Sequence, residues 1–181
     1  MAKLGIFMAD GCEEIEGLTV VDILRRGGIE IDMIAIANKK MIHGSHGINF
    51  EADVMAKDAD YASYDGIVLP GGMHGTLRLT ADTVVNEVIK TYAAEGKLVS
   101  AICAAPSVLG LAGLLEGKHA TSYPGWGEKM PGCIYETEKV VKDGNIITSR
   151  GMGTAIDFAL AILAYYQNAA AAEEMAQRIM F

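Results

Sequence analysis

Hydrophobic residues along the chain fall into short continuous runs and into longer segments with helical spacing. The short runs predict buried strands over residues 3–8, 29–36, 66–69 and 98–102. The longer segments predict helices over residues 13–26, 82–94, 104–115, 154–166 and 169–179. Glycine turns between apolar runs predict hairpins over residues 41–50 and 140–148. Thr154 is expected to cap the helix that follows it.

Strands that alternate with helices predict an α/β fold, with a mostly parallel sheet and helices on both faces. The 181 residues suit one core, so we expect a single domain over residues 1–181. In such a sheet the active crevice lies at the carboxyl ends of the strands. Three conspicuous places fall there, namely the turn at 10–13, the turn at 70–72, and Cys103.

Charge and cysteine content narrow the function classes. The net charge of −8 disfavours binding to a phosphate backbone, so no nucleic-acid partner is expected. Three widely spaced cysteines without a CxxC pair predict neither a disulfide framework nor a zinc or other metal site. The sequence shows no signal-peptide apolar region and no membrane span, so we expect a cytoplasmic protein without a membrane partner.

The pattern around Cys103 is typical of a nucleophile on a tight strand-to-helix turn. Ala101 and Ala105 supply the small neighbours that such a turn needs, and Pro106 fits the first turn of a helix. A helix N-terminus favours a thiolate, so we predict a lowered thiol pKa for Cys103, with the Ala104 N–H donating to an oxyanion. A small buried core cysteine is the alternative interpretation.

Glu16 is the second catalytic candidate because its helical position is apolar. The residues on the same helical face are Val20, Ile23 and Leu24. Burial raises a carboxyl pKa, so Glu16 could exchange a proton with Cys103. The alternative is an acid that stabilises a helix N-terminus, and this role is sufficient for Glu13 and Glu14.

Gly71 and Gly72 follow a predicted strand directly, and either N–H could be a second oxyanion donor. The alternative is an ordinary tight loop. Cys12 lies at another strand end and could line the same crevice. Of the histidines, His74 is the one expected to face the crevice.

Five segments together match a known family over nearly the whole chain. They are residues 10–16, 21–28, 68–72, 101–106 and 148–154. On these motifs the chain resembles the ThiJ/PfpI superfamily, and specifically the Parkinson-linked protein deglycase branch. The resemblance implies a flavodoxin-like three-layer sandwich, like that of class I glutamine amidotransferases, and a homodimer without a cofactor.

The resemblance also implies a site. Cys103 would be the reactive cysteine and would bond a protonated Glu16, while the Gly72 and Ala104 N–H groups form an anion pocket. Many relatives carry a histidine where Tyr123 stands, so here Glu16 would perform the proton transfers next to a substrate-binding Tyr123.

Two further residues are assigned to the crevice or the dimer interface by this resemblance. His46 stands where human-type proteins carry an arginine near the interface, and Arg150 belongs to the last motif.

We therefore expect a cofactor-free glyoxalase and deglycase. Its substrates would be 2-oxoaldehydes such as methylglyoxal and glycated proteins, attacked by the Cys103 thiolate. The main alternative is a non-catalytic oxidative-stress sensor or redox-regulated chaperone that uses the same cysteine. A third hypothesis, an amidase of the glutamine-amidotransferase kind, normally requires a histidine partner.

Overall fold

A seven-stranded sheet forms the centre of the molecule, which a computed structural model describes for residues 2–181. Its strands are β1 (Lys3–Met8), β2 (Glu30–Ala35), β5 (Val54–Met55), β6 (Gly66–Leu69), β7 (Leu98–Ile102), β10 (Val140–Asp143) and β11 (Ile146–Ser149). They lie in the order β10-β11-β7-β6-β1-β2-β5, and β10 with β11 is the antiparallel pair among them. Two small sheets pair β3 (Met41–His43) with β4 (Asn49–Glu51) and β8 (His119–Ala120) with β9 (Ile134–Tyr135).

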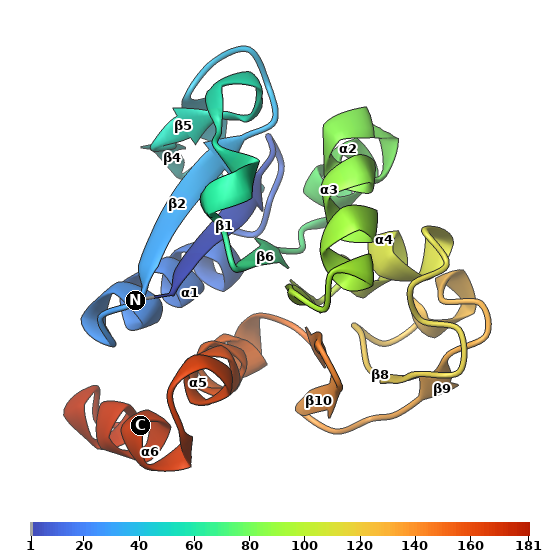
Figure 1. Ribbon diagram of the computed structural model, residues 1–181. Helices are drawn as coiled ribbons and strands as arrows, with labels where there is room; N and C mark the ends of the chain where they lie inside the picture. The colour runs from blue at the N-terminus through green and yellow to red at the C-terminus, as the bar shows by residue number, and fades with distance from the viewer. Residues whose placement is uncertain (1) are drawn as a thin grey trace.

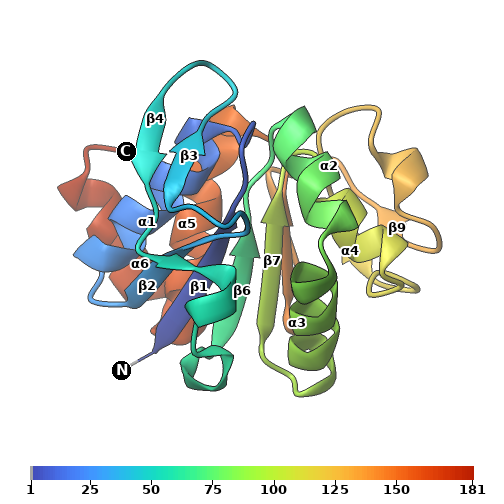
Figure 2. The ribbon, with the colours of Figure 1, turned by 90° about the horizontal axis from the view of Figure 1, so that it is seen from above.

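Helices cover both faces of the sheet (Figure 1). One face carries α1 (Glu14–Arg26), α5 (Ala155–Tyr166) and α6 (Ala169–Arg178). The other carries α2 (Met73–Ala81), α3 (Thr83–Ala94) and α4 (Pro106–Leu111), as Figure 2 shows. Short 3-10 helices are η1 (Ala56–Asp58), η2 (Tyr61–Ser63), η3 (Gly127–Lys129) and η4 (Met152–Thr154). The predicted flavodoxin-like three-layer sandwich is confirmed.

Strand β1 shows why the central strands are continuous apolar runs. Alternate side chains of a strand point to opposite faces. Ile6 accordingly packs into the cluster that contains Val20 of α1 and Phe158 of α5. Phe7 packs into the second cluster, which contains Ile89 of α3. Because helices cover both faces, each position of such a strand must be apolar.

The predicted helices and strands are present, but the structure adds β5, the β8–β9 pair and α2, and it shortens α4. Helix α2 was not predicted, because its sequence opens after two glycines and has a further glycine within its first turn. Helix α4 ends at Leu111 rather than at residue 115, in a segment where Gly110 and Gly113 weaken helix formation.

The strand order places the candidate site. The order β2-β1-β6-β7-β11 is that of flavodoxin-like sheets, in which the strand order reverses between β1 and β6. Ligands bind at this switch point, outside the carboxyl ends of the strands. The loops after β1, β6 and β7 meet there. Within residues 2–181, no helix has the length and apolar character needed to cross a membrane.

Candidate active site

Cys103 occupies a strained turn directly after β7. Its φ of 66° lies in the left-handed region, which costs a non-glycine residue about 1–3 kcal/mol. Two backbone hydrogen bonds hold the turn. The Cys103 N–H donates to the Ser149 carbonyl at 3.0 Å, and the Cys103 carbonyl accepts the Tyr123 N–H at 2.8 Å. The tight turn that the small neighbours predict is therefore present.

Glu16 projects from the first turn of α1 into the same place, with 1% of its surface exposed. Its Oε2 accepts the Gly71 N–H at 2.9 Å. The Met152 N–H and the Cys103 thiol also face this carboxyl and favour its ionised form. Burial nevertheless raises the pKa of Glu16 to about 7, because these contacts offset only part of the lost hydration. The apolar position deduced from the sequence is confirmed.

The prediction of a lowered thiol pKa for Cys103 is wrong. Burial and the Glu16 carboxylate raise the pKa of Cys103 to about 12, against the opposing effect of the Gly72 and Ala104 N–H groups. Helix α4 begins only at Pro106 and has six residues, so its dipole adds little. A thiolate at Cys103 therefore requires its proton to reside on Glu16, and the two groups titrate as a pair.

The two glycines after β6 have different roles. A Cβ on Gly71 would lie 2.5 Å from Glu16 Oε2 and 2.6 Å from the Cys103 Cβ, so this close approach requires glycine. The Gly71 N–H is taken by Glu16, which removes Gly71 as an oxyanion donor. Gly72, at a φ of 87°, directs its N–H to the Cys103 sulfur, as Ala104 does. Gly72 and Ala104 thus provide the two donors beside the thiol.

Comparison with known proteins identifies the family of the chain. Residues 2–165 match the DJ-1/PfpI family. The chain belongs to the DJ-1/PfpI family.

Individual relatives match over most of the chain. The chain is 36% identical to Protein DJ-1alpha of Drosophila melanogaster over 179 residues, covering 97% of this chain and 82% of the relative. It is 35% identical over 156 residues to Glutathione-independent glyoxalase DJR-1.2 of Caenorhabditis elegans, covering 85% of this chain and 82% of the relative. The structure of oxidized Toxoplasma gondii DJ-1 superposes with a TM-score of 0.96 at 32% identity, covering 100% and 99% of the two chains.

Some relatives in the DJ-1/PfpI family are much longer. Protein DJ-1 homolog B of Arabidopsis thaliana is 37% identical over 163 residues, which cover 89% of this chain. The chain spans only 37% of the length of that relative.

Of the other candidate residues of this DJ-1/PfpI chain, Tyr123 lies at the edge of the site. The Tyr123 ring is half exposed and would be 3.4 Å from a Cβ on Gly151, which brings the ring to the edge of the site. His74 is exposed on the first turn of α2, beside Gly11. The Arg150 guanidinium donates to the Thr137 carbonyl at 2.6 Å.

Cys12 and His46 lie at the amino end of α1, beside a second buried carboxyl that the sequence did not single out. Glu14 is 2% exposed and accepts the backbone N–H groups of His46 at 2.7 Å and Ile48 at 3.4 Å, together with the Ser45 hydroxyl at 3.2 Å. These donors outweigh burial and lower the pKa of Glu14. Glu14 therefore fastens the β3–β4 hairpin rather than merely stabilising a helix end. Cys12 is 1% exposed, and burial raises its pKa to about 12.

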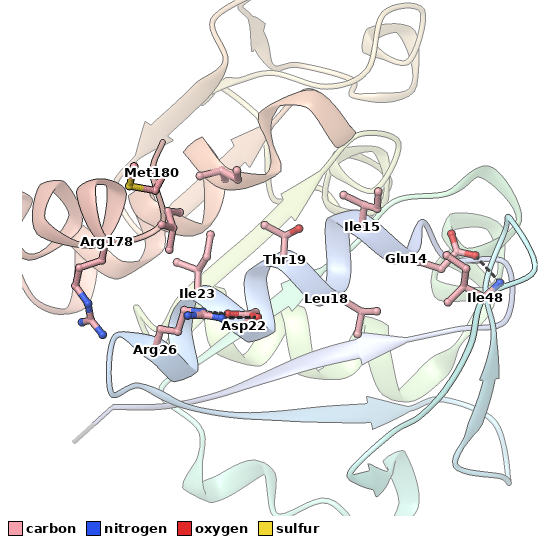
Figure 3. Close-up of a pocket in the computed structure, with 12 residues that line it drawn as sticks. Glu14, Ile15, Leu18, Thr19, Asp22, Ile23, Arg26, Ile48, Arg178 and Met180 are labelled. Atoms are coloured by element: carbon pink, nitrogen blue, oxygen red, sulfur yellow. Dashed lines mark hydrogen bonds and ion pairs between the residues drawn. The ribbon is translucent and has the colours of Figure 1, made fainter.

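A cavity lies on the outer side of α1, and Cys103 is not among the residues that line it. It has a volume of about 640 Å³. Figure 3 shows that α1 lines it from Glu14 at one end to Arg26 at the other, with Met180 near the carboxyl end. Helix α1 thus directs Glu16 into the crevice and an apolar face outward.

Sequence reasoning missed the residues that support the pair from the turn after β11. They are Ser149, Met152 and Thr154. The motif at 148–154 was visible in the sequence, but nothing in it shows that a backbone N–H would reach Glu16.

Proposed function

We propose that the chain converts 2-oxoaldehydes such as methylglyoxal into 2-hydroxy acids without glutathione. The observation that carries the proposal is the contact between the buried Glu16 carboxyl and the Cys103 thiol, with the Gly72 and Ala104 N–H groups directed at the sulfur. The Caenorhabditis elegans relative, named a glutathione-independent glyoxalase, supports the same reaction.

The first step joins Cys103 to the substrate. As the sulfur bonds to the aldehyde carbon, the thiol proton passes to the Glu16 carboxylate. The carbonyl oxygen becomes negative within reach of the Gly72 and Ala104 N–H groups, which stabilise it. It then takes the proton from Glu16, giving a hemithioacetal and restoring the carboxylate.

The second step moves a proton between two carbons. Glu16 removes the hydrogen of the former aldehyde carbon as a proton, and the electrons of that C–H bond form an enediolate. Glu16 then delivers the proton to the neighbouring carbon, and the hydroxyl proton on the former aldehyde carbon passes to the oxygen of the former ketone. The former aldehyde carbon is thereby oxidised to a thioester and the former ketone carbon is reduced to an alcohol. Water cleaves the C–S bond and releases the 2-hydroxy acid and the Cys103 thiol.

Deglycation would use the same attack on an early adduct of an aldehyde with a protein amine or thiol. The site supports this extension because its thiol is not fully covered by the rest of the chain. Cys103 is partly exposed, and the half-exposed Tyr123 ring stands at its edge, where it would contact the substrate.

The direct test is conversion of methylglyoxal to lactate by the wild type and by Cys103→Ala. We expect turnover by the wild type and none above the uncatalysed rate by the variant, because no nucleophile remains to form the hemithioacetal. Equal lactate production by both proteins would refute the proposal.

A redox sensor or chaperone is the second candidate, favoured by one observation. The Toxoplasma gondii relative is described as oxidized, and in this chain the amides beside Cys103 suit the anion that cysteine oxidation produces. The sensor or chaperone role would replace the glyoxalase proposal if the wild type showed no turnover and oxidation of Cys103 changed the binding of unfolded protein by the chain.

We also propose that the chain forms a homodimer through the cavity face of α1. Exposed apolar side chains gather there, among them Ile15, Ile48 and Met180. A second copy of the same face would remove this apolar surface from water. Light scattering should give about twice the 19.2 kDa chain mass, and Ile15→Asp should lower it toward 19.2 kDa. A wild-type mass of one chain would refute the dimer.

A further inference from the structure

Thr154 occupies the N-cap position of α5, but its hydroxyl does not bond to that helix. The sequence predicts a capping side chain there, and the structure corrects this. The Thr154 Oγ1 instead accepts the backbone N–H groups of Gly151 at 3.2 Å and Arg150 at 3.3 Å. It also lies 2.7 Å from the Ser149 Oγ and 3.0 Å from the Gly151 carbonyl.

The available donors and acceptors place the Thr154 hydroxyl at the centre of this hydrogen-bond network. A threonine hydroxyl has one hydrogen to donate and two lone pairs. The Ser149 hydroxyl lies 2.7 Å from the Lys139 carbonyl and can give its hydrogen there. The Thr154 hydrogen is then available to the Gly151 carbonyl and to the Ser149 Oγ, while its lone pairs accept the two N–H groups. One side chain thereby fixes the whole turn between β11 and η4.

That turn touches both members of the reactive pair. At its start, the Ser149 carbonyl accepts the Cys103 N–H at 3.0 Å. At its end, the Met152 N–H faces the Glu16 carboxyl and favours its ionised form. Between them, a Cβ on Gly151 would lie 3.9 Å from Glu16 Oε1, so the turn passes directly beside the carboxyl. A shift of the turn must therefore change the position of the Glu16 carboxyl relative to the Cys103 thiol.

We propose that Thr154 is a positioning residue that sets the Glu16 carboxyl against the Cys103 thiol by holding the Met152 N–H in place. The inference rests on the pair described under the proposed function, but it concerns the ionisation of that pair rather than turnover. Thr154 itself does not touch the reacting atoms.

The test is the pH dependence of Cys103 alkylation by iodoacetamide, followed by mass spectrometry of the Cys103 peptide. The variants are Thr154→Val, which keeps the shape and removes the hydroxyl, and Thr154→Ser, which restores the hydroxyl. The control is Ser63→Ala, which removes a hydroxyl that donates to the Asp60 carbonyl at 2.7 Å. The other titratable groups that act on Glu16, namely Cys103 and Glu13, are unchanged in every variant.

Loss of the Met152 donor makes the ionised carboxyl less favourable, so the pair should release its first proton at higher pH. For Thr154→Val we expect the alkylation midpoint to move upward by about one pH unit, given the strength of hydrogen bonds to charged groups. Thr154→Ser and Ser63→Ala should keep the wild-type midpoint. A folded Thr154→Val protein with the wild-type midpoint would overturn the proposal.

A second variant covers the case in which Thr154→Val does not fold. Ser149→Ala removes the hydroxyl partner of Thr154 and should move the midpoint in the same direction by a smaller amount. An unchanged midpoint in Ser149→Ala would then overturn the proposal. Because alkylation needs no aldehyde, these shifts can appear in a protein without glyoxalase activity, which separates this inference from the proposed function.

Discussion

Helix α1 carries two buried carboxyls, two residues apart, in opposite electrostatic states. Glu14 faces the β3–β4 hairpin, and the donors gathered there lower its pKa. Glu16 faces the crevice, and burial raises its pKa to about 7. Each also has a cysteine neighbour, Cys12 beside Glu14 and Cys103 beside Glu16.

The difference shows that burial alone does not make a carboxyl suitable for proton transfer. Glu14 receives backbone N–H groups and a hydroxyl from one hairpin, so its charge is stabilised and it serves as a structural anchor. Glu16 shares its contacts with a thiol and is poised between its two protonation states near neutral pH. The balance between lost hydration and the stabilising contacts around each carboxyl therefore decides which one suits proton transfer.

The largest expected effect separates the two carboxyls by turnover. Glu16→Gln keeps the shape and removes the titrating group, so methylglyoxal turnover should fall by a factor of about 100 to 10,000. Glu14→Gln is the matched control and should stay within about threefold of the wild type, because Glu14 contacts the hairpin rather than the reacting atoms. Equal turnover by both variants would show that Glu14 and Glu16 do not differ in their role in the reaction.

The free energy of unfolding, relative to the wild type, should change with pH in opposite directions for the same two variants. The raised pKa of Glu16 means that its stabilising protonated form is fully present below its usual value of 4.5 and is lost as the pH rises through about 7. Glu16→Gln should therefore match the wild type at about pH 4 and be more stable at about pH 8, by up to about 3 kcal/mol.

Glu14→Gln should show the reverse dependence. The lowered pKa of Glu14 means that its ionised form stabilises the fold above its unfolded pKa, and that this contribution is lost as the pH falls through the folded value. The variant should be less stable than the wild type at neutral pH and should approach it in acid. Urea unfolding across the pH range measures both variants, and curves of the same sign would contradict the account.

The smallest effect is expected at the cysteine beside Glu14. Cys12 is buried, its thiol pKa is raised to about 12, and its backbone φ is not in the left-handed region that Cys103 occupies. Cys12→Ser should keep methylglyoxal turnover within about twofold. A loss as complete as that of Cys103→Ala would mean that the crevice needs both cysteines.

Short-range sequence patterns predicted Cys103 and Glu16, but they missed the residues that hold this pair in place. The apolar stripe below Glu16 and the small neighbours of Cys103 are visible in sequence because they arise from helical and turn geometry over a few residues. The burial of Glu14 is not visible, because its donors come from a hairpin about thirty residues away. The role of the Gly71 N–H likewise depends on a contact between separate elements.

The same limit explains the errors at Cys103 and Thr154. A lowered thiol pKa follows from a helix N-terminus alone, but the structure adds the Glu16 charge and a helix of only six residues. Thr154 stands where a cap belongs, but its hydroxyl bonds backward to the preceding turn. Interactions between elements, which single-sequence patterns do not contain, decide both cases.

The central claim is that Glu16 titrates near neutral pH while Glu14 does not. Carbon-13 NMR of glutamate side-chain carboxyls, recorded across the pH range, measures this directly. We predict one carboxyl resonance with a midpoint of about 7 that is absent in Glu16→Gln and retained in Glu14→Gln. A spectrum in which every glutamate titrates near the ordinary value of about 4.3 would contradict the account.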